Sequence, residues 1–203
     1  ITSSMKIGIL ALQGDYEKHA LILENLEIES VFIRYPQELH DVDGLIIPGG
    51  ESTTLTHLMH KNDFYNTIKE FAKSKPVLGT CAGLIMMANK VEHALVDPLG
   101  LMDIAVDRNA YGRQVHSFVD ELPIRLNGQE EIISATFIRA PRISKIGKDV
   151  EILAEYNNEP CAVKQGKHIA LSFHPELNEI NIFHKSAFCK NEAIEQKESF
   201  YAA

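Results

Sequence analysis

A cysteine flanked by glycines is the first candidate for chemistry in this chain. Cys81 lies in Gly79-Thr80-Cys81-Ala82-Gly83, between an apolar run suited to a strand and one suited to a helix. This pattern is the cysteine counterpart of the G-x-S-x-G nucleophile elbow, whose crowded turn requires small neighbours. The start of the following helix favours the thiolate, which is the reactive form. A lone cysteine is more often a buried small hydrophobe, but the elbow pattern favours a nucleophile.

A histidine and a carboxylate follow the last apolar strand, in Ser172-Phe173-His174-Pro175-Glu176-Leu177. A thiol nucleophile needs a base, and the base needs a group that holds its tautomer. His174 can supply the base and Glu176 the orienting carboxylate, while Pro175 stiffens the turn between them. His-x-Glu alone is a weak signal, because such pairs are common on protein surfaces. Together with Cys81, it predicts a Cys81–His174–Glu176 triad for acyl transfer.

A glycine pair in Pro48-Gly49-Gly50-Glu51-Ser52-Thr53-Thr54 is a candidate oxyanion loop. Acyl transfer needs N–H donors where the tetrahedral oxyanion forms. We expect the N–H groups of Gly50 and Ala82 to be these donors, with Gly49 allowing the turn. The alternative is an ordinary strand–helix turn capped by Ser52 or Thr53. A phosphate loop is excluded, because the Lys-Ser/Thr pair that it requires is missing.

The elements that must position these motifs alternate between strand and helix in the first half of the chain. The expected strands there are Lys6–Leu12, Ser30–Arg34, Gly44–Pro48 and Pro76–Thr80. Such nearly continuous apolar runs are typical of a parallel sheet covered on both faces. In these sheets, sites form at the carboxyl ends of the strands, which is where the three motifs fall. We therefore expect an α/β fold with a central, mostly parallel sheet.

The second half is richer in strands and adds antiparallel elements. The expected strands are Phe118–Leu126, Ile132–Arg139, Val150–Tyr156, Cys161–Gln165 and Ile169–Phe173, with turns at Asn127-Gly128, Asn157-Asn158 and Gln165-Gly166. The expected helices are one capped by Asp15 with Ala20, Leu23 and Leu26 on one face, one starting near Glu51, Tyr65–Lys73, Ala82–Ala88, and a closing helix over Ile182–Tyr201.

Length and composition limit the class of protein. The 203 residues, 45% of them hydrophobic and without internal repeats, predict a single domain over residues 5–203, preceded by an added segment at residues 1–4. The net charge of −8 argues against a nucleic-acid partner. The chain has no apolar run of the ~20 residues that a membrane span needs, so no membrane partner is expected. An odd number of cysteines, three, fits a reducing compartment, and we expect a cytoplasmic protein.

Further histidines and cysteines are assigned no chemistry. His57 and His60 lack other metal ligands, so we expect a solvated helix surface and neither a metal nor another cofactor. Cys161 and Cys189 are expected to be structural, and the Met86-Met87 pair to be core. Two interpretations of His19 are equally supported, a place near a partner interface and an ordinary helix surface.

The motifs, taken together, resemble a known family. Ala11-Leu12-Gln13-Gly14-Asp15, the glycine loop, the cysteine elbow and the His-Pro-Glu segment occur in order and together resemble the glutaminase subunit of pyridoxal 5′-phosphate synthase. The elbow and the His-Pro-Glu segment are shared by all class I glutamine amidotransferases. Arg108-Asn109-Ala110-Tyr111-Gly112-Arg113-Gln114 and Phe137-Ile138-Arg139-Ala140-Pro141 resemble the glutaminase subunit of pyridoxal 5′-phosphate synthase in particular. The resemblance extends from about Met5 to Leu177.

The resemblance implies a flavodoxin-like, three-layer α/β/α fold and hydrolysis of L-glutamine to L-glutamate and ammonia. It also implies a partner, a (β/α)₈-barrel synthase subunit that takes the ammonia to build pyridoxal 5′-phosphate, the vitamin B6 cofactor. By matched position, the glutamine-binding residues are Gly49, Gly50, Glu51, Arg108, Ile138 and Arg139. Arg108 suits the α-carboxylate of glutamine through its guanidinium fork. Glu51 suits the α-ammonium or fixes the oxyanion loop, and Ile138 and Arg139 are expected to contribute backbone groups.

Three alternatives remain open on this sequence. The chain can be the glutaminase subunit of another ammonia-dependent synthase, such as imidazole glycerol phosphate synthase, although the segment starting at Arg108 argues against that. It can be a catalytically inactive regulatory subunit that kept the fold. The same triad can also hydrolyse a peptide or a γ-glutamyl conjugate.

Overall fold

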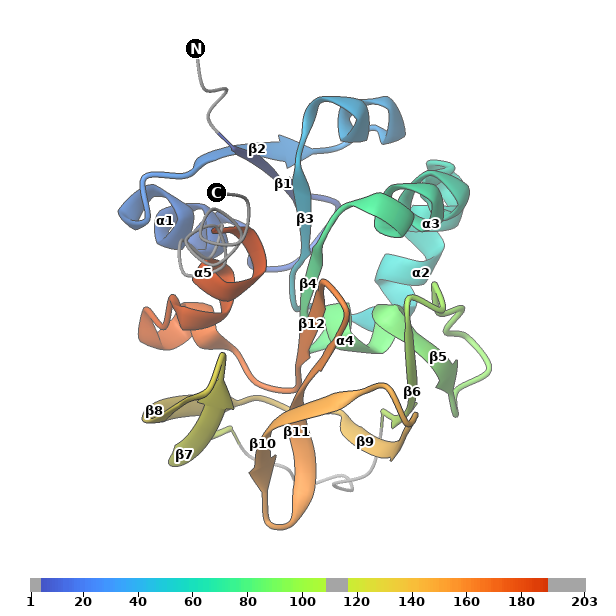
Figure 1. The fold of residues 1–203 in the computed structure, drawn as a ribbon. Coiled ribbons are helices and arrows are strands. Elements are labelled where there is room, and N and C mark those ends of the chain that lie inside the picture. Colours follow the sequence, from blue (N-terminus) through green and yellow to red (C-terminus); the bar gives the residue numbers. More distant parts are fainter. Residues whose placement is uncertain (1–4, 109–116, 190–203) are drawn as a thin grey trace, which may run out of the picture.

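The computed structural model describes residues 5–108 and 117–189. Within these residues, seven strands form a central sheet in the order β10-β11-β12-β4-β3-β1-β2 (Figure 1). Their bounds are β1 Lys6–Leu10, β2 Glu29–Ile33, β3 Gly44–Ile47, β4 Val77–Thr80, β10 Glu151–Tyr156, β11 Glu159–Gln165 and β12 His168–Leu171. The strands from β2 to β12 pair in parallel, and β11 and β10 extend the sheet antiparallel. The parallel part, in order 2-1-3-4 followed by β12, is the flavodoxin-like arrangement, so the expected fold class is confirmed.

The sheet is covered on both faces because its strands are apolar on both. Leu45 and Ile47 of β3 belong to one buried apolar cluster, whereas Ile46 between them belongs to a second. Successive side chains of a strand point to opposite faces, so the two clusters are the two cores of a three-layer structure. The continuous apolar runs had predicted this burial.

Helices form the outer layers. On one face lie α1 Glu17–Asn25 and α5 Ile182–Phe188, and on the other lie α2 Ser52–Lys61, α3 Phe64–Ser74 and α4 Ala82–Met87 (Figure 1). The short 3-10 helices η1 Pro36–Asp41 and η3 Pro175–Asn178 also belong to the described part of the chain. None of the helices in the described ranges is long and apolar enough to cross a membrane.

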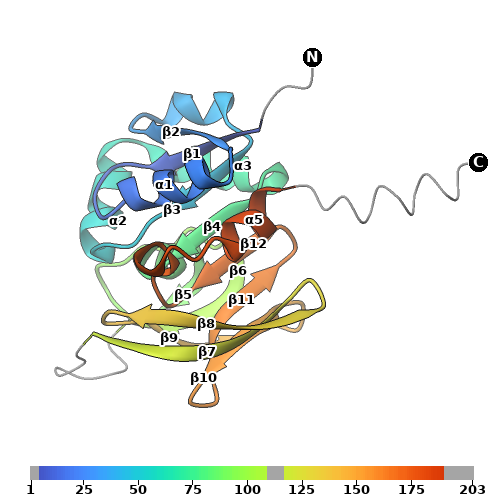
Figure 2. The same ribbon diagram turned by 90° about the vertical axis from the view of Figure 1, so that its left-hand side faces the viewer.

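Smaller sheets lie beside the antiparallel end of the central sheet (Figure 2). The hairpin of β7 Phe118–Leu126 and β8 Gln129–Phe137 turns at Asn127 and Gly128, which have φ of 53° and 77°. This is the turn that the Asn-Gly pair predicted. A further sheet contains β5 Ala88–Val91, β6 Met102–Asp107 and β9 Arg142–Ile146, strands that the sequence had not indicated.

The ends of two helices differ from expectation. Asp15 does not cap α1, whose N-cap is Tyr16 without a side-chain hydrogen bond; Asp15 instead pairs with Lys18. The predicted capping of α1 by Asp15 is therefore wrong. The closing helix expected over Ile182–Tyr201 ends at Phe188, and the chain from residue 190 lies outside the described residues. Residues 1–4 and the stretch 109–114 of the family-like segment also lie outside them.

Candidate active site

Cys81 occupies the turn between β4 and α4 in a backbone conformation that L-residues rarely adopt, with φ of 50° and ψ of −105°. Its N–H donates to the carbonyl of Leu171 at 2.8 Å, which ties the turn to the end of β12. Small neighbours are required here, because a Cβ on Gly83 would lie 1.9 Å from the carbonyl oxygen of Ile47. The strand–turn–helix elbow expected around Cys81 is therefore present.

His174 follows β12 and is oriented by Glu176. Its Nδ1 lies 2.6 Å from Glu176 Oε1, and its backbone N–H donates to the carbonyl of Thr136 at 2.9 Å. Burial opposes protonation of His174, but interactions with Cys81 and Glu176 outweigh it and raise the pKa of the imidazole to about 10. The imidazole is thus held as a cation that faces a cysteine on one side and a carboxylate on the other.

Cys81 and His174 open onto one cavity. Its volume is about 370 Å³, within the range of small-molecule sites. It is lined by Gly50, Glu51, Ser52, Cys81, Ile85, Arg108, Ile138, Arg139 and His174. Gly49 and Ala82 are not in this lining but directly precede Gly50 and follow Cys81. The structure thus brings the expected nucleophile, base and most of the expected glutamine-binding residues around a single space.

Ile138 and Arg139 enter the cavity from the segment after β8. The Cys81 thiol lies 3.8 Å from the Ile138 carbonyl oxygen, to which it donates a weak hydrogen bond. Arg139 has a φ of 43°, a left-handed conformation that is uncommon outside glycine. This backbone bend therefore lies in the lining of the same cavity as Cys81.

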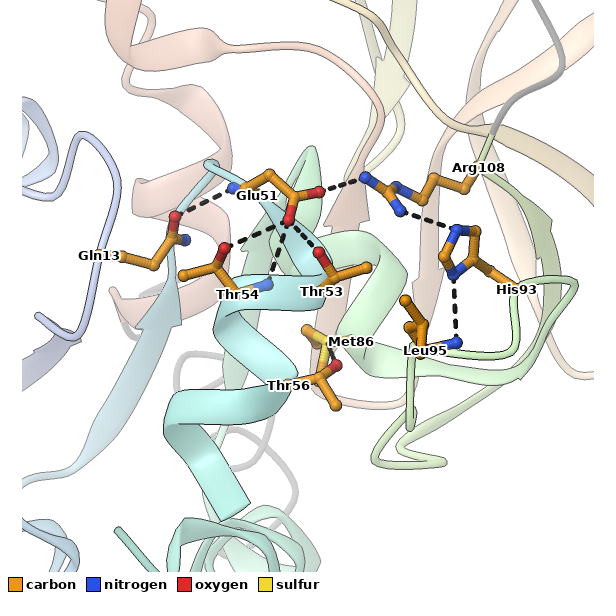
Figure 3. Close-up of polar contacts among 9 residues, drawn as sticks. All are labelled: Gln13, Glu51, Thr53, Thr54, Thr56, Met86, His93, Leu95 and Arg108. Carbon is orange, nitrogen blue, oxygen red and sulfur yellow. Dashed lines mark hydrogen bonds and ion pairs between the residues drawn. The ribbon is translucent and has the colours of Figure 1, made fainter. Parts of the chain in front are cut away.

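Glu51 joins the glycine loop to Arg108 (Figure 3). Its carboxylate accepts the backbone N–H of Thr54 at 3.1 Å and the hydroxyl of Thr53, which caps α2, and it forms an ion pair with Arg108. Partial burial opposes ionisation of Glu51, but these hydrogen bonds and the Arg108 charge hold its pKa below the usual value. The backbone N–H of Glu51 donates to Gln13 Oε1 at 3.0 Å, which fixes the loop from the β1 side.

His93 contacts the guanidinium of Arg108, which also pairs with Glu51. Its Nε2 lies 3.1 Å from Arg108 Nη1, and its Nδ1 lies 3.3 Å from the backbone N–H of Leu95 (Figure 3). A neutral imidazole has a single acceptor nitrogen, so only one of these contacts is a hydrogen bond at a time. The guanidinium is the stronger donor and the closer one, which assigns the proton of His93 to Nδ1.

The methionines, cysteines and histidines to which no chemistry was assigned lie partly where the sequence predicts. Met86 and Met87 are fully buried in the core and Cys161 is buried, with a pKa that burial raises to about 12, as structural residues should be. His60 is exposed and pairs with Asp97, and the described part of the chain contains no cluster of histidine, cysteine or acidic residues suited to a metal. The expected surface position of His19 is wrong, because its side chain is fully buried.

Sequence reasoning missed four polar residues of this region, namely Gln13, His19, His93 and His184. The burial of His19 had a signal, because it lies at i, i+3 and i+4 spacing with Ile22 and Leu23, the buried positions of α1. Gln13 was part of a recognised motif without an assigned role. The contacts of His93 and His184 have no local signal, because the partner residues lie 15 and 165 positions away in the sequence.

Comparison with solved structures places this fold in a class. A crystal structure described as a glutamine amidotransferase superimposes with a TM-score of 0.82 at 38% identity, covering 88% of this chain and 95% of the other. A Thermotoga maritima structure described as PurLQS aligns with a TM-score of 0.70 at 17% identity, over 91% of this chain and 98% of that one, which supports the fold alone. The fold is that of a class I glutamine amidotransferase.

Sequence comparison gives the family. Residues 9–193 match the model of the SNO glutamine amidotransferase family, and the chain belongs to that family. The pyridoxal 5′-phosphate synthase subunit PdxT of Shouchella clausii is 48% identical over 187 residues, which cover 92% of this chain and 94% of that protein. The corresponding subunit of Thermosipho africanus is 44% identical over 182 residues, covering 89% and 96%.

Proposed function

We propose that this chain is the glutaminase subunit of a pyridoxal 5′-phosphate synthase, with Cys81, His174 and Glu176 as its catalytic triad. The observation that supports the triad most strongly is the shared cavity of Cys81 and His174, together with the 2.6 Å contact that fixes His174 Nδ1 on Glu176. That contact leaves Nε2 of His174 for the thiol and the substrate.

The proposed reaction is nucleophilic acyl transfer in two stages. The Cys81 thiolate attacks the side-chain amide carbon of glutamine, and the imidazolium of His174 gives its proton to the departing ammonia. The raised pKa of His174 supports this first role, because the ring holds a proton at neutral pH. His174, now neutral, takes a proton from water, whose oxygen attacks the thioester. Glutamate leaves and the Cys81 thiolate is restored.

The oxyanion of each tetrahedral intermediate needs donors beside Cys81. We assign this role to the backbone N–H groups of Gly50 and Ala82, the first on the loop that lines the cavity and the second at the start of α4. Each such donor contributes ~2.7–4 kcal/mol in comparable sites. The bond from Glu51 to Gln13 and the cap on α2 support this assignment, because both restrain the loop that carries Gly50.

The pair formed by Arg108 and Glu51 suits the zwitterionic end of free glutamine. The α-carboxylate of glutamine would lie on the guanidinium and the α-ammonium on the carboxylate, so that opposite charges face each other. Both side chains line the cavity with Cys81, which supports one ligand reaching the ion pair and the nucleophile together. Gly49, Ile138 and Arg139 would bound the ligand with backbone groups.

The names of the relatives support the proposed partner. The proteins that are 44% and 48% identical over most of their length are named as pyridoxal 5′-phosphate synthase subunits. We propose that the ammonia passes directly to a (β/α)₈-barrel synthase subunit, and that the two proteins act as a complex in the cytoplasm.

The proposal is tested by measuring glutamate release from glutamine with and without the synthase barrel. Turnover should appear with the barrel and disappear in Cys81→Ala. The matched control is Cys161→Ala, which removes another buried cysteine on β11 and should retain turnover. Turnover only with a different synthase would assign the chain to another pathway. Absence of turnover with every partner would favour a regulatory subunit.

A further inference from the structure

Two buried histidines behind Glu176 are not used by the proposed reaction. His19 of α1 and His184 of α5 are both fully buried, and His19 Nδ1 lies 2.9 Å from His184 Nε2. Burial lowers the pKa of each imidazole to about 3, so both rings are neutral at physiological pH. A buried polar pair of this kind needs a structural reason, because it costs more than an apolar pair unless it satisfies another group.

The group that this pair can satisfy is Oε2 of Glu176, the carboxylate oxygen that does not contact His174. Glu176 Oε1 is bonded to His174, whereas Oε2 is buried and has no hydrogen-bond partner within normal distance among the described residues. His19 Nε2 lies 3.6 Å from this oxygen, and the side chains of His19 and Glu176 are 0% and 1% exposed. A carboxylate oxygen left unpaired in such a place is strongly unfavourable.

The proton positions on the two histidines follow from their shared contact. One ring must donate and the other must accept. If His184 Nε2 donates, the proton of His19 lies on Nε2, where it faces Glu176 Oε2 and the Thr80 hydroxyl at 3.4 Å. The opposite assignment would turn a nitrogen lone pair toward the carboxylate. The first assignment is favoured because it places an N–H against the negative charge.

We propose that His19, held in this tautomer by His184, is a positioning residue. It fixes Oε2 of Glu176 and, through this carboxylate, the orientation of His174. This inference rests on the proposed triad and extends it inward, from Cys81 through His174 and Glu176 to two helices on one face of the sheet (Figure 1). It also explains why α1 keeps a histidine at a fully buried position.

Two substitutions of His19 separate this role from simple packing. His19→Gln keeps an amide N–H near the place of Nε2, facing Glu176. His19→Asn keeps a polar group near the place of Nδ1, facing His184, but is too short to reach Glu176. The control is His168→Asn, because His168 accepts the backbone N–H of Val77 at 3.1 Å, at the opposite end of β4 from Cys81.

The experiment measures kcat and KM for glutamine in the complex with the synthase barrel, with urea unfolding of each variant. His19→Asn should lower kcat about 10- to 100-fold with KM near wild type, a typical effect of losing a residue that orients a catalytic group. His19→Gln should recover most of that loss, and His168→Asn should retain kcat. In a Glu176→Gln background, His19→Asn should have no further effect, because its influence passes through the carboxylate.

A folded His19→Asn variant with wild-type kcat would overturn the inference, and so would equal losses of kcat in His19→Gln and His19→Asn. It would also be overturned if the loss of kcat in His19→Asn added fully to the loss caused by Glu176→Gln. If His19→Asn does not fold, His184→Phe replaces it, because it frees the tautomer of His19 and should also lower kcat, whereas unchanged kcat would refute the role. Failure of the proposed function looks different, because Cys81→Ala and Glu176→Gln would then themselves leave hydrolysis unchanged.

Discussion

Adding a single methyl group at Gly49 should inactivate the enzyme without unfolding it. A Cβ on this residue would lie 2.6 Å from Cε1 of His174 and 3.4 Å from Cβ of Cys81. Carbon atoms in contact lie about 3.5–4.0 Å apart, so the ring must move by roughly 1 Å. His174 has little freedom to do so, because its Nδ1 is bonded to Glu176 and the residue is 8% exposed.

The magnitude follows from that displacement. Misplacing a catalytic group by about 1 Å costs roughly 100-fold in rate, so kcat of Gly49→Ala should fall by about that factor. Overpacking of this kind costs about 1–3 kcal/mol of stability, which corresponds to a fall in Tm of about 2 to 12 °C for a chain of this length. The variant should therefore remain folded at 25 °C.

Gly44→Ala is the matched control for this substitution. Gly44 begins β3, the strand that Gly49 follows, and a Cβ there would lie 2.7 Å from the ring of Phe188. The two variants thus add the same methyl group against a ring at nearly the same distance, at opposite ends of one strand. Both should lose stability, and only Gly49→Ala should lose glutamine hydrolysis. Wild-type kcat in Gly49→Ala, or an equal loss in Gly44→Ala, would refute the reasoning.

Three further results are expected. Arg108→Ala should raise KM for glutamine roughly 10- to 100-fold with little change in kcat. The reason is that a charged hydrogen bond to the substrate's carboxylate stabilises the bound substrate and the transition state equally. A lower kcat at unchanged KM would contradict this. Because burial lowers the pKa of His184 from 6.5 to about 3, its share of the stability is present above pH 6.5 and lost as pH falls toward 3. His184→Gln should therefore flatten the decline of the unfolding free energy by roughly 1 kcal/mol per pH unit in that range, measured by urea unfolding. An unchanged slope would contradict the neutral, buried assignment. Iodoacetamide at pH 8 should label Cys81 and leave Cys161 unmodified, because burial raises the pKa of Cys161 to about 12; peptide mapping reads the result, and early modification of Cys161 would oppose it.

The parts of the molecule that the sequence predicted well are those determined by nearest neighbours. The elbow around Cys81 needs glycines within two residues on either side, and the β7–β8 turn needs Asn127 and Gly128. The two-sided burial of β3 is encoded in its own apolar run. In each case, a local conformational or apolar requirement selects the residue types, so the pattern is visible without knowledge of the fold.

The parts that were missed depend on partners far away in the chain. β5, β6 and β9 have mixed burial patterns, and β6 pairs with β9 between residues that lie 35 to 42 positions apart in the sequence. The pairing of Glu51 with Arg108 spans 57 residues, and that of His19 with His184 spans 165. The face of a nine-residue helix is also weakly specified by its pattern, which is why His19 was assigned to the surface.

The central step of the proposed mechanism is a covalent bond between Cys81 and the substrate, and trapping that bond tests it most directly. The complex with the synthase barrel is mixed with glutamine, quenched in acid during turnover and digested, and the peptide that contains Cys81 is examined by mass spectrometry. We predict a glutamyl adduct on Cys81 in the wild-type chain and none on Cys161 or Cys189. Steady glutamate release without any adduct on Cys81, and undiminished in Cys81→Ala, would contradict the proposed mechanism.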